Sequence, residues 1–284
     1  MCAIPAAAMP PKLGIVAGGG VLPERLVEAC RAQDRPFHVL AIEGQGDPER
    51  FAGVPCSRVR LGAIGRAFDL LRQAGVEEIV FSGAFRRPSL AALRPDARAL
   101  RMLTGVGGRL GSDDRLMRAL IEVCEREEGF RVIGPEAVFD GLMAERGPLG
   151  GLSPDEAETG DIAYGVAVAT SLGRLDVGQA VVVHQGVVLG VEAAEGTDAL
   201  IRRCSGLRRE EAGGVLVKVC KPQQEPRADP PVIGPATVAV AAEARLRGIA
   251  VEAGRTLVLD RAAVARAADD ARLFVVGVEV EVRG

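Results

Sequence analysis

Short apolar runs alternate with amphipathic stretches through the first half of the chain. A continuous apolar run that stops at glycine or at polar residues is typical of a strand buried on both faces of a parallel sheet. Apolar residues spaced three or four positions apart predict helices that cover such a sheet. On this pattern the strands are 13–17, 37–42, 78–82 and 131–133, and the helices are 21–32, 64–74, 90–110 and 113–127.

The second half opens after a segment rich in glycine and proline, 145–154, which we interpret as a linker. Two valine-rich runs flank His184-Gln185-Gly186, and this pattern predicts a hairpin. Further elements are expected at 155–172, 197–204, 214–220, 237–247, 256–259, 261–269 and 273–280. The sequence therefore predicts an α/β fold with two domains: a Rossmann-like N-terminal domain with a mostly parallel sheet, 12–144, and a second, mixed α/β C-terminal domain, 155–284.

Charge and composition narrow the function classes. The 284 residues carry 35 Lys and Arg against 38 Asp and Glu, a net charge of -3, which argues against a nucleic-acid partner. Two histidines exclude a zinc site built on several imidazoles, so a metal would be held by carboxylates, which favours Mg²⁺ or Mn²⁺. Six cysteines without a C-x-x-C spacing indicate reduced thiols. With no bilayer-spanning run and no basic leader in 1–11, we expect a cytoplasmic protein.

A glycine turn, Gly18-Gly19-Gly20, joins the first predicted strand to the first helix. Such a turn exposes backbone N–H groups to an anion, so it indicates a phosphate or nucleotide contact, although a tight turn without a ligand has the same sequence. It is not a complete dinucleotide fingerprint, because Pro23 stands where the third glycine belongs. Glu43, after the second strand, is either a ligand for a ribose hydroxyl or a solvated acid.

An excess of arginine follows the third predicted strand. Between residues 86 and 109 there are six arginines against one acid, Asp96. The stretch is either a solvated helix face or a site for an anionic ligand, including the surface of the inner membrane. Asp113 and Asp114 either cap the next helix or bind a metal or a substrate hydroxyl. The arginines are Arg86, Arg87, Arg94, Arg98, Arg101 and Arg109.

Two polar segments of the second half are candidates for chemistry. Glu192, Glu195 and Asp198 surround Thr197 at a strand-to-helix junction, where they either cap the helix or hold a hard cation. A loop with five prolines, 218–235, brings lysines, amides, an arginine and acids together. Prolines stiffen such a loop, and cations beside acids suit phosphoryl or nucleotidyl transfer, although an exposed loop remains the alternative.

These segments together resemble a known family, the UDP-2,3-diacylglucosamine pyrophosphatases of lipid A biosynthesis that are unrelated to the metallophosphoesterases. The resemblance covers residues 12 to about 280. The most specific motifs are Glu195-Gly196-Thr197-Asp198 and the loop from Lys221-Pro222 to Ile233-Gly234. The others are Leu13 to Gly20 with Leu22-Pro23, Gly83 with Arg87-Pro88, Gly111 with Asp113-Asp114, and Gly173 to Gln179.

The resemblance implies a Mg²⁺-dependent hydrolase that converts UDP-2,3-diacylglucosamine to UMP and 2,3-diacylglucosamine 1-phosphate (lipid X), with the ligand between two domains. The essential aspartate of the family corresponds to Asp229, which would bind Mg²⁺ or orient the water. Lys221 and Arg227 complete the hypothetical catalytic set. The further metal candidates are Glu192, Glu195 and Asp198, and the substrate candidates are Gly18, Gly19, Gly20, Gly83, Arg87, Asp113, Asp114, Gln179, Thr197 and Gln224.

Two other functions remain open on the sequence alone. An NAD(P)-dependent oxidoreductase would use the glycine turn and Glu43, and a non-catalytic protein would bind the UDP-sugar or lipid phosphate without turnover. Peripheral contact with the inner-membrane surface and a homo-oligomer are also open. The acyl chains need an apolar cleft, which we expect between the domains.

Overall fold

The computed structural model describes residues 9–85, 93–105, 113–207 and 213–280. The chain divides into two compact units. The N-terminal unit runs to Phe139 and also includes Arg227–Asp229, which come from a loop of the second half. The C-terminal unit consists of Asp140–Pro226 and Pro230–Gly284.

The N-terminal unit is built on a parallel sheet, in which the described strands lie in the order β3-β2-β1-β4-β5. This is the order of a Rossmann-like fold, and it confirms that prediction. The order reverses between β1 and β4, so a crevice is expected where their carboxyl ends diverge. β3 was not predicted. The strands are β1 (Leu13–Ala17), β2 (Phe37–Ile42), β3 (Cys56–Val59), β4 (Glu78–Ser82) and β5 (Arg131–Ile133).

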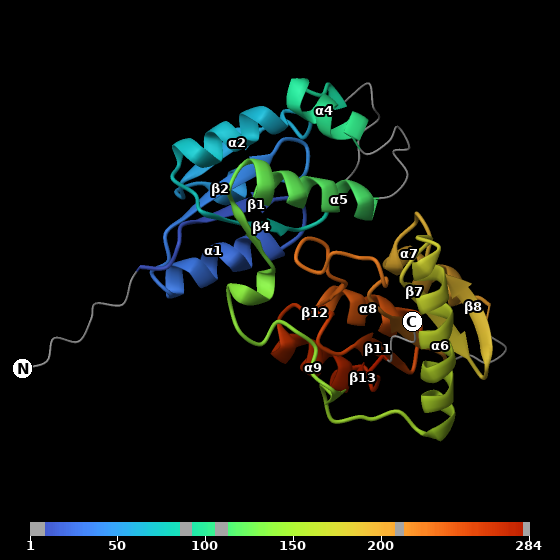
Figure 1. Cartoon of the computed structure of the whole chain (residues 1–284). Coiled ribbons are helices and arrows are strands. Elements are labelled where there is room, and N and C mark those ends of the chain that lie inside the picture. The colour runs from blue at the N-terminus through green and yellow to red at the C-terminus, as the bar shows by residue number, and fades with distance from the viewer. Residues whose placement is uncertain (1–8, 86–92, 106–112, 208–212, 281–284) are drawn as a thin grey trace, which may run out of the picture. The chain divides into compact units, whose positions relative to one another are not determined.

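Helices cover both faces of this sheet (Figure 1). One face carries α1, which buries Leu22, Leu26 and Cys30 and has proline in its first turn. The opposite face carries α2, α4 and α5. α2 packs closely on β1, since a Cβ on Gly14 would lie 3.0 Å from Leu71. The elements are α1 (Leu22–Ala32), α2 (Ile64–Gln73), α4 (Ala97–Gly105), α5 (Asp113–Glu122), the π-turn η2 (Val123–Glu127), and the 3₁₀ turns η1 (Pro48–Phe51) and η3 (Pro135–Ala137).

The long helix predicted at 90–110 is interrupted, because Leu93 is helical and residues 94–96 are not. In the described part of this segment, α4 starts at Ala97 because the side chain of Asp96 accepts hydrogen bonds from the backbone N–H groups of Arg98 and Ala99. Arg94 lies just before this cap in the left-handed region, with φ of 42°, where a helix cannot continue. The remaining parts of the prediction, 90–92 and 106–110, lie outside the described residues.

The C-terminal unit contains a mixed sheet, as predicted, with its described strands in the order β6-β13-β11-β9-β7-β8. α6 covers one face, and α7, α8 and α9 cover the other (Figure 1). A small parallel pair, β10 and β12, lies apart from this sheet. The elements are β6 (Gly147–Pro148), α6 (Glu156–Arg174), β7 (Ala180–His184), β8 (Val187–Val191), α7 (Thr197–Cys204), β9 (Val215–Lys218), β10 (Val232–Ile233), α8 (Pro235–Glu243), β11 (Gly248–Glu252), β12 (Leu257–Val258), α9 (Arg261–Asp270) and β13 (Phe274–Val278).

The pattern of apolar residues missed β11, although this strand lies in the interior of the sheet. All five of its residues are buried, between β9 and β13. It follows α8 after a short turn in which Arg245 has φ of 53°, so the apolar residues of helix and strand run together along the sequence. A short, fully buried strand lacks the alternation that separates a strand from a helix.

Candidate active site

The glycine turn is held from outside by the chain that follows β4. Gly18 N–H donates to the carbonyl of Ser82 over 2.8 Å, and Gly19 N–H donates to the carbonyl of Ala84 over 2.8 Å. The expectation that these two N–H groups meet a phosphate is therefore not met, because both are already bonded. Gly20 has φ of 84°, a left-handed conformation that suits glycine. A Cβ on Gly83 would overlap the Gly19 carbonyl, so Gly83 permits this close approach.

Arg50, which the sequence analysis did not single out, ties down the carbonyl side of the same turn. Its guanidinium donates to the carbonyl of Gly20 over 2.7 Å and to that of Gly18. The group also lies 3.7 Å from the Glu24 carboxylate and 4.8 Å from the ring centroid of Phe51. The turn is thus fixed on both sides, and no local sequence pattern links an arginine thirty positions away to it.

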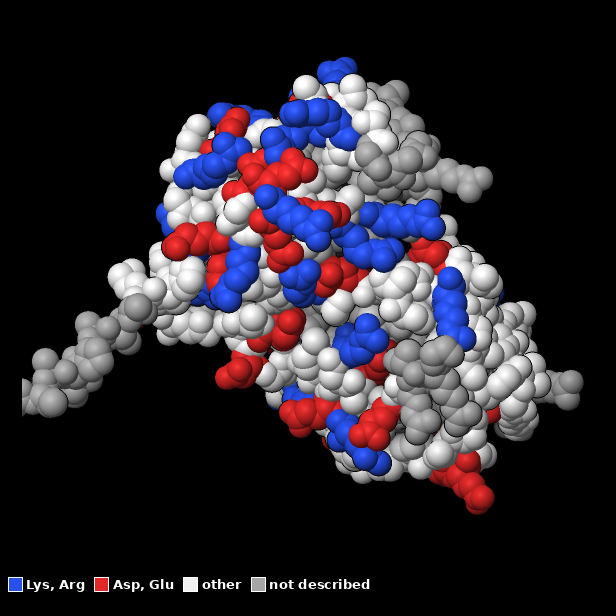
Figure 2. Space-filling view, viewed as in Figure 1, with Lys and Arg blue, Asp and Glu red and all other residues white. Residues whose placement is uncertain are grey.

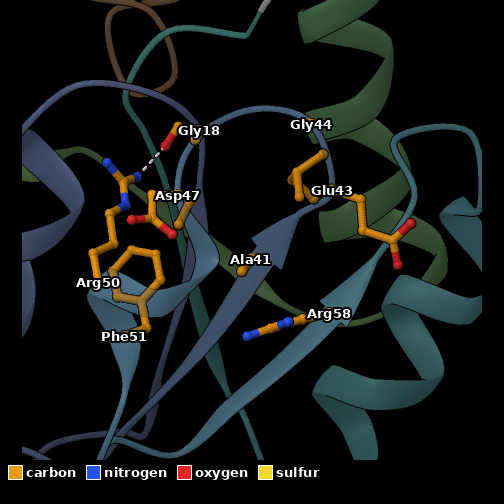
Figure 3. Close-up of a pocket in the computed structure, with 11 residues that line it drawn as sticks. Gly18, Ala41, Glu43, Gly44, Asp47, Arg50, Phe51 and Arg58 are labelled. Atoms are coloured by element: carbon orange, nitrogen blue, oxygen red, sulfur yellow. Dashed lines mark hydrogen bonds between the residues drawn. The ribbon is translucent and has the colours of Figure 1, made fainter.

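A cavity of about 220 Å³, with four charged residues in its lining, opens beside the turn at the carboxyl ends of β1, β2 and β3 (Figure 3). Its floor is formed by a row of residues in register on the three strands, Ala17, Ala41 and Arg58. Glu43, Asp47 and the Arg50–Phe51 pair line its walls, together with Gly18, Ile42, Gly44 and Gly46.

A second cavity, of about 360 Å³, lies on the other side of the same sheet. Aliphatic and aromatic side chains from the strands and from α2, α4 and α5 make up nearly all of its lining. Arg60 and Asp229 are the charged residues on its wall. The cleft for acyl chains was expected between the domains, whereas this apolar cavity belongs to the N-terminal unit. Its apolar lining includes Val16, Leu40, Ile42, Val59, Leu61, Ile64, Ala67, Phe68, Leu71, Ile79, Phe81, Phe85, Leu93, Ala99, Met102, Leu116, Met117 and Leu120.

Asp229 reaches this wall because its two preceding residues are anchored in the N-terminal unit. The Arg227 guanidinium donates to the Glu125 carboxylate over 2.8 Å and to the carbonyl of Val132 over 3.3 Å. Ala228 is buried in the apolar core of the unit. The contacts of Arg227 with protein groups support an anchoring role more directly than the predicted neutralisation of phosphate.

The start of the proline-rich loop is ordered by buried amide contacts. Gln224 is buried, and its Oε1 accepts from the Lys221 N–H over 3.1 Å and from the Cys220 thiol over 3.3 Å. This places Gln224 in the support of the loop rather than at an open surface. The Lys221 ammonium lies 2.8 Å from the Asp176 carboxylate.

Glu252 supports the same loop from β11. Its carboxylate accepts from the Cys220 N–H over 2.8 Å, and burial raises the pKa of Glu252 above its ordinary value.

The predicted carboxylate cluster at the start of α7 is also engaged. Buried Glu192 accepts from the Thr197 hydroxyl over 2.6 Å and from the Gln179 N–H over 3.2 Å. The Lys218 ammonium donates to Thr197 Oγ1 over 3.1 Å. Glu195 pairs with Arg203 over 2.7 Å, and this hydrogen bond lowers the pKa of Glu195.

Asp198 lies in the first turn of α7, where a negative charge suits the helix dipole. In the parts of the chain that the structure describes, no group of three or more His, Cys, Asp or Glu side chains is arranged to hold a metal ion.

The structure describes only part of the arginine stretch and of the candidates near it. Arg87 lies outside the described residues, and Asp113 and Asp114 open α5. Arg86 and Arg109 of the arginine stretch are likewise outside them. Arg98 pairs with Glu127 over 2.9 Å and with Glu128. Figure 2 shows basic and acidic side chains interspersed on this face of the N-terminal unit rather than a purely basic patch.

Two family models together match most of this chain. The model of the LpxI N-terminal domain matches residues 12–142, and that of the LpxI C-terminal domain matches residues 145–276. The chain belongs to the LpxI family. A relative from Caulobacter vibrioides, named UDP-2,3-diacylglucosamine pyrophosphatase LpxI, is 45% identical over an alignment of 282 residues that covers 96% of this chain and 99% of that protein.

Among solved structures, a match to N5-carboxyaminoimidazole synthase from Aspergillus clavatus, in complex with ADP and an aminoimidazole ribonucleotide, reaches a TM-score of only 0.22. It has 13% identity over 70% of this chain and 44% of that one, and we base no argument on it.

For this member of the LpxI family, the two domain models meet close to Phe139, the residue that ends the main segment of the N-terminal unit. Arg227–Asp229 fall within the C-terminal family model and yet belong by contact to the N-terminal unit. No described helix has both the length and the apolar run needed to cross a bilayer.

Proposed function

We propose that this protein hydrolyses the pyrophosphate bond of UDP-2,3-diacylglucosamine, in lipid A biosynthesis, to UMP and 2,3-diacylglucosamine 1-phosphate. Its membership of the LpxI family and its 45% identity to a pyrophosphatase of that name support the reaction. One structural observation carries the proposal. An apolar cavity in the N-terminal unit has a carboxylate, Asp229, on its wall.

The cavity suits the lipid part of this substrate. Acyl chains gain stability from leaving water, by about 0.8 kcal/mol for each buried methylene. Side chains from the strands and from α2, α4 and α5 offer such an environment. A chain lying along this cavity would end near Asp229, where the polar part of the substrate begins.

Mg²⁺ is a reasonable cofactor on the donor chemistry of this chain. Magnesium sites that act on phosphates commonly use only one or two protein carboxylates and complete the coordination with phosphate oxygens and water. Asp229 would provide such a carboxylate, and the ion would neutralise charge on the diphosphate. Glu192 and Glu195 have hydrogen-bond partners within their own unit, so they are weaker candidates for this task.

In this proposal the protein groups hold the reacting parts in place. Asp229 binds the ion or orients the attacking water, and Arg227 positions Asp229 by its contacts with Glu125 and Val132. Lys221, held by Asp176, remains a candidate for neutralising a phosphate oxygen. The cytoplasmic location, peripheral contact with the inner membrane and homo-oligomerisation remain predictions.

The test is a hydrolysis assay in ¹⁸O-labelled water. The purified chain is incubated with UDP-2,3-diacylglucosamine and Mg²⁺, and both products are analysed by mass spectrometry. We expect UMP and the diacyl sugar phosphate to form, with the label on one product identifying the phosphorus that water attacks. Chelation of the metal should stop the reaction, and readdition of Mg²⁺ should restore it.

Binding of the substrate without release of UMP would reject the hydrolase in favour of a binding protein. Substrate-independent binding of NAD(P)H, together with no UMP release, would favour the oxidoreductase instead.

A further inference from the structure

Lysine is rare in this chain, and two of its three lysines lie at the start of the proline-rich loop. The 35 basic residues include only Lys12, Lys218 and Lys221, and the others are arginines. An arginine presents a planar fork of donors, whereas a lysine brings a compact ammonium to a single point. Lys221 has a candidate role in the proposed reaction, but Lys218 has none so far, and its contacts indicate one.

Lys218 is the last residue of β9, and it is buried although it carries a charge, with 7% of its surface exposed. Removing an ammonium from water is unfavourable unless protein groups replace the water. Two oxygens do so here: the ammonium donates to Thr197 Oγ1 over 3.1 Å and to the Val232 carbonyl over 3.1 Å. The buried ammonium thus joins the start of α7 to the segment in which the chain returns from the loop.

The contact with Thr197 links the ammonium to a negative charge. The Thr197 hydroxyl donates its proton to buried Glu192 over 2.6 Å, so its oxygen remains an acceptor for Lys218. The same carboxylate also accepts from the Gln179 N–H. Ammonium, hydroxyl and carboxylate therefore form one connected row, and polar groups linked in this way hold one another in a single arrangement.

The contact with Val232 fixes the far end of the loop. The carbonyls of Pro231 and Ile233, on either side of Val232, accept hydrogen bonds from the segment that contains β12. The Val232 carbonyl between them is bonded to Lys218 instead. This segment is therefore held twice, by backbone pairing with β12 and by the side chain of a buried lysine. Loss of the ammonium would remove the second of these supports.

Only Pro230-Pro231 separates Val232 from Asp229 along the chain. Proline fixes its own φ and restricts the residue before it, so a shift at Val232 is passed along the chain instead of being absorbed. We propose that Lys218 is a positioning residue of the hydrolase, which holds the Asp229 carboxylate in place through the Val232 carbonyl. The inference rests on the proposed function. Arg227 anchors the chain before Asp229, and Lys218 anchors the chain after it.

The first test is a double-mutant cycle in the hydrolysis assay. Lys218→Met keeps the length of the side chain and removes its donors, so we expect kcat for UMP release to fall about tenfold with KM unchanged. In the Asp229→Asn background the same substitution should have almost no further effect, because no carboxylate is left to position. Lys12→Met, which removes an ammonium just before β1, is the matched control and should leave kcat unchanged.

The second test follows the loop without using the reaction. Trypsin cleaves after arginine, and the Arg227–Ala228 bond lies within the loop. We expect cleavage at this bond to be about tenfold faster in Lys218→Met than in the unmodified protein, because the loop opens locally. Cleavage at the Arg255–Thr256 bond requires wider opening of the same unit, since Thr256 is fully buried, and it should keep its rate.

Full kcat in Lys218→Met, or the same loss with and without the Asp229 carboxylate, would overturn the inference. Faster cleavage at both bonds would also overturn it, because Lys218 would then stabilise the unit as a whole. If Lys218→Met does not fold, its combination with Glu192→Gln removes both buried charges together and takes its place in the cycle.

The two tests also separate this inference from the proposed function. Normal UMP release by both the unmodified protein and Lys218→Met, with unchanged cleavage, rejects only the positioning role. No UMP release by the unmodified protein rejects the proposed reaction, and the cleavage rates then still decide whether Lys218 holds the loop.

Discussion

The two units use buried parallel strands in different ways. In the C-terminal unit, α6 packs so near β9 that a Cβ on Gly165 would lie 2.5 Å from Val217. Its buried Glu192 and Lys218 both bond to the Thr197 hydroxyl, and its buried Glu252 accepts from a backbone N–H. In the N-terminal unit, both described cavities open at the sheet, and the small residues Ala17 and Ala41 leave the space for the smaller of them.

This difference assigns different tasks to the two units. A tightly packed sheet gives a rigid support, and cavities at the sheet of the other unit give room for a ligand. The residues that join the two tasks are Arg227–Asp229, which the C-terminal half of the sequence contributes and the N-terminal unit holds. The following experiments test this division, from the largest expected effect to the smallest.

Replacing the carboxylate at the apolar cavity should have the largest effect. Asp229→Asn keeps the size of the side chain and removes its charge, so we expect kcat for UMP release to fall on the order of a thousandfold. Asp69→Asn, on the exposed surface of α2, is the control for a lost carboxylate. Near-normal turnover in Asp229→Asn, with an unchanged melting temperature, would contradict the assignment.

Filling the apolar cavity should change the choice of acyl chain. Ala67 of α2 lines the cavity, and a phenylalanine there would displace methylenes of a bound chain. Since each buried methylene stabilises by about 0.8 kcal/mol, displacing two of them should lower kcat/KM for long-chain substrates about tenfold relative to short-chain ones. Arg66→Phe adds the same ring to the exposed face of α2 and should leave this ratio unchanged. Equal ratios in both variants would place the acyl chains elsewhere.

A third experiment distinguishes two roles of Arg227, which either anchors Asp229 or binds phosphate itself. Arg227 and Glu125 form a half-exposed ion pair, so breaking it from either side should lower kcat by about fivefold. We expect Arg227→Gln and Glu125→Gln to give similar losses in steady-state assays, because both release the same contact. A large loss in Arg227→Gln with none in Glu125→Gln would instead indicate that Arg227 contacts the substrate.

The smallest effect is expected at Glu252, in the buried strand β11 of the C-terminal unit. Because burial raises the pKa of Glu252 above its ordinary value of 4.5, folding favours the protonated form. The stability that protonated Glu252 contributes is fully present below pH 4.5. It is lost as the pH rises through the pKa of Glu252 in the folded state. The melting temperature of the unmodified protein, relative to Glu252→Gln, should therefore rise as the pH falls from 7 towards 4.

Glu243→Gln, on the exposed surface of α8, is the control for that measurement. If the melting temperature of the unmodified protein relative to Glu243→Gln shows the same pH dependence, burial of Glu252 is not its cause.

Local patterns in the sequence were sufficient for much of the fold and for the identity of one residue. The apolar runs of β1, β2 and β4 and the spacing in α1 and α2 predicted these elements, since neighbours along the chain determine buried strands and amphipathic helices. The resemblance carried by the proline-rich loop singled out Asp229, whose role is still a prediction.

Only the tertiary structure decided what surrounds these residues. β11 became a strand because β9 and β13 pair with it, and Arg50 reached the glycine turn through the path of the chain after β2. The apolar cavity brings together side chains from strands and helices far apart in the sequence, and Asp229 joins them through Arg227 and Ala228. Such contacts depend on the packing of whole elements, and the periodicity of a single segment contains no information about its distant partners.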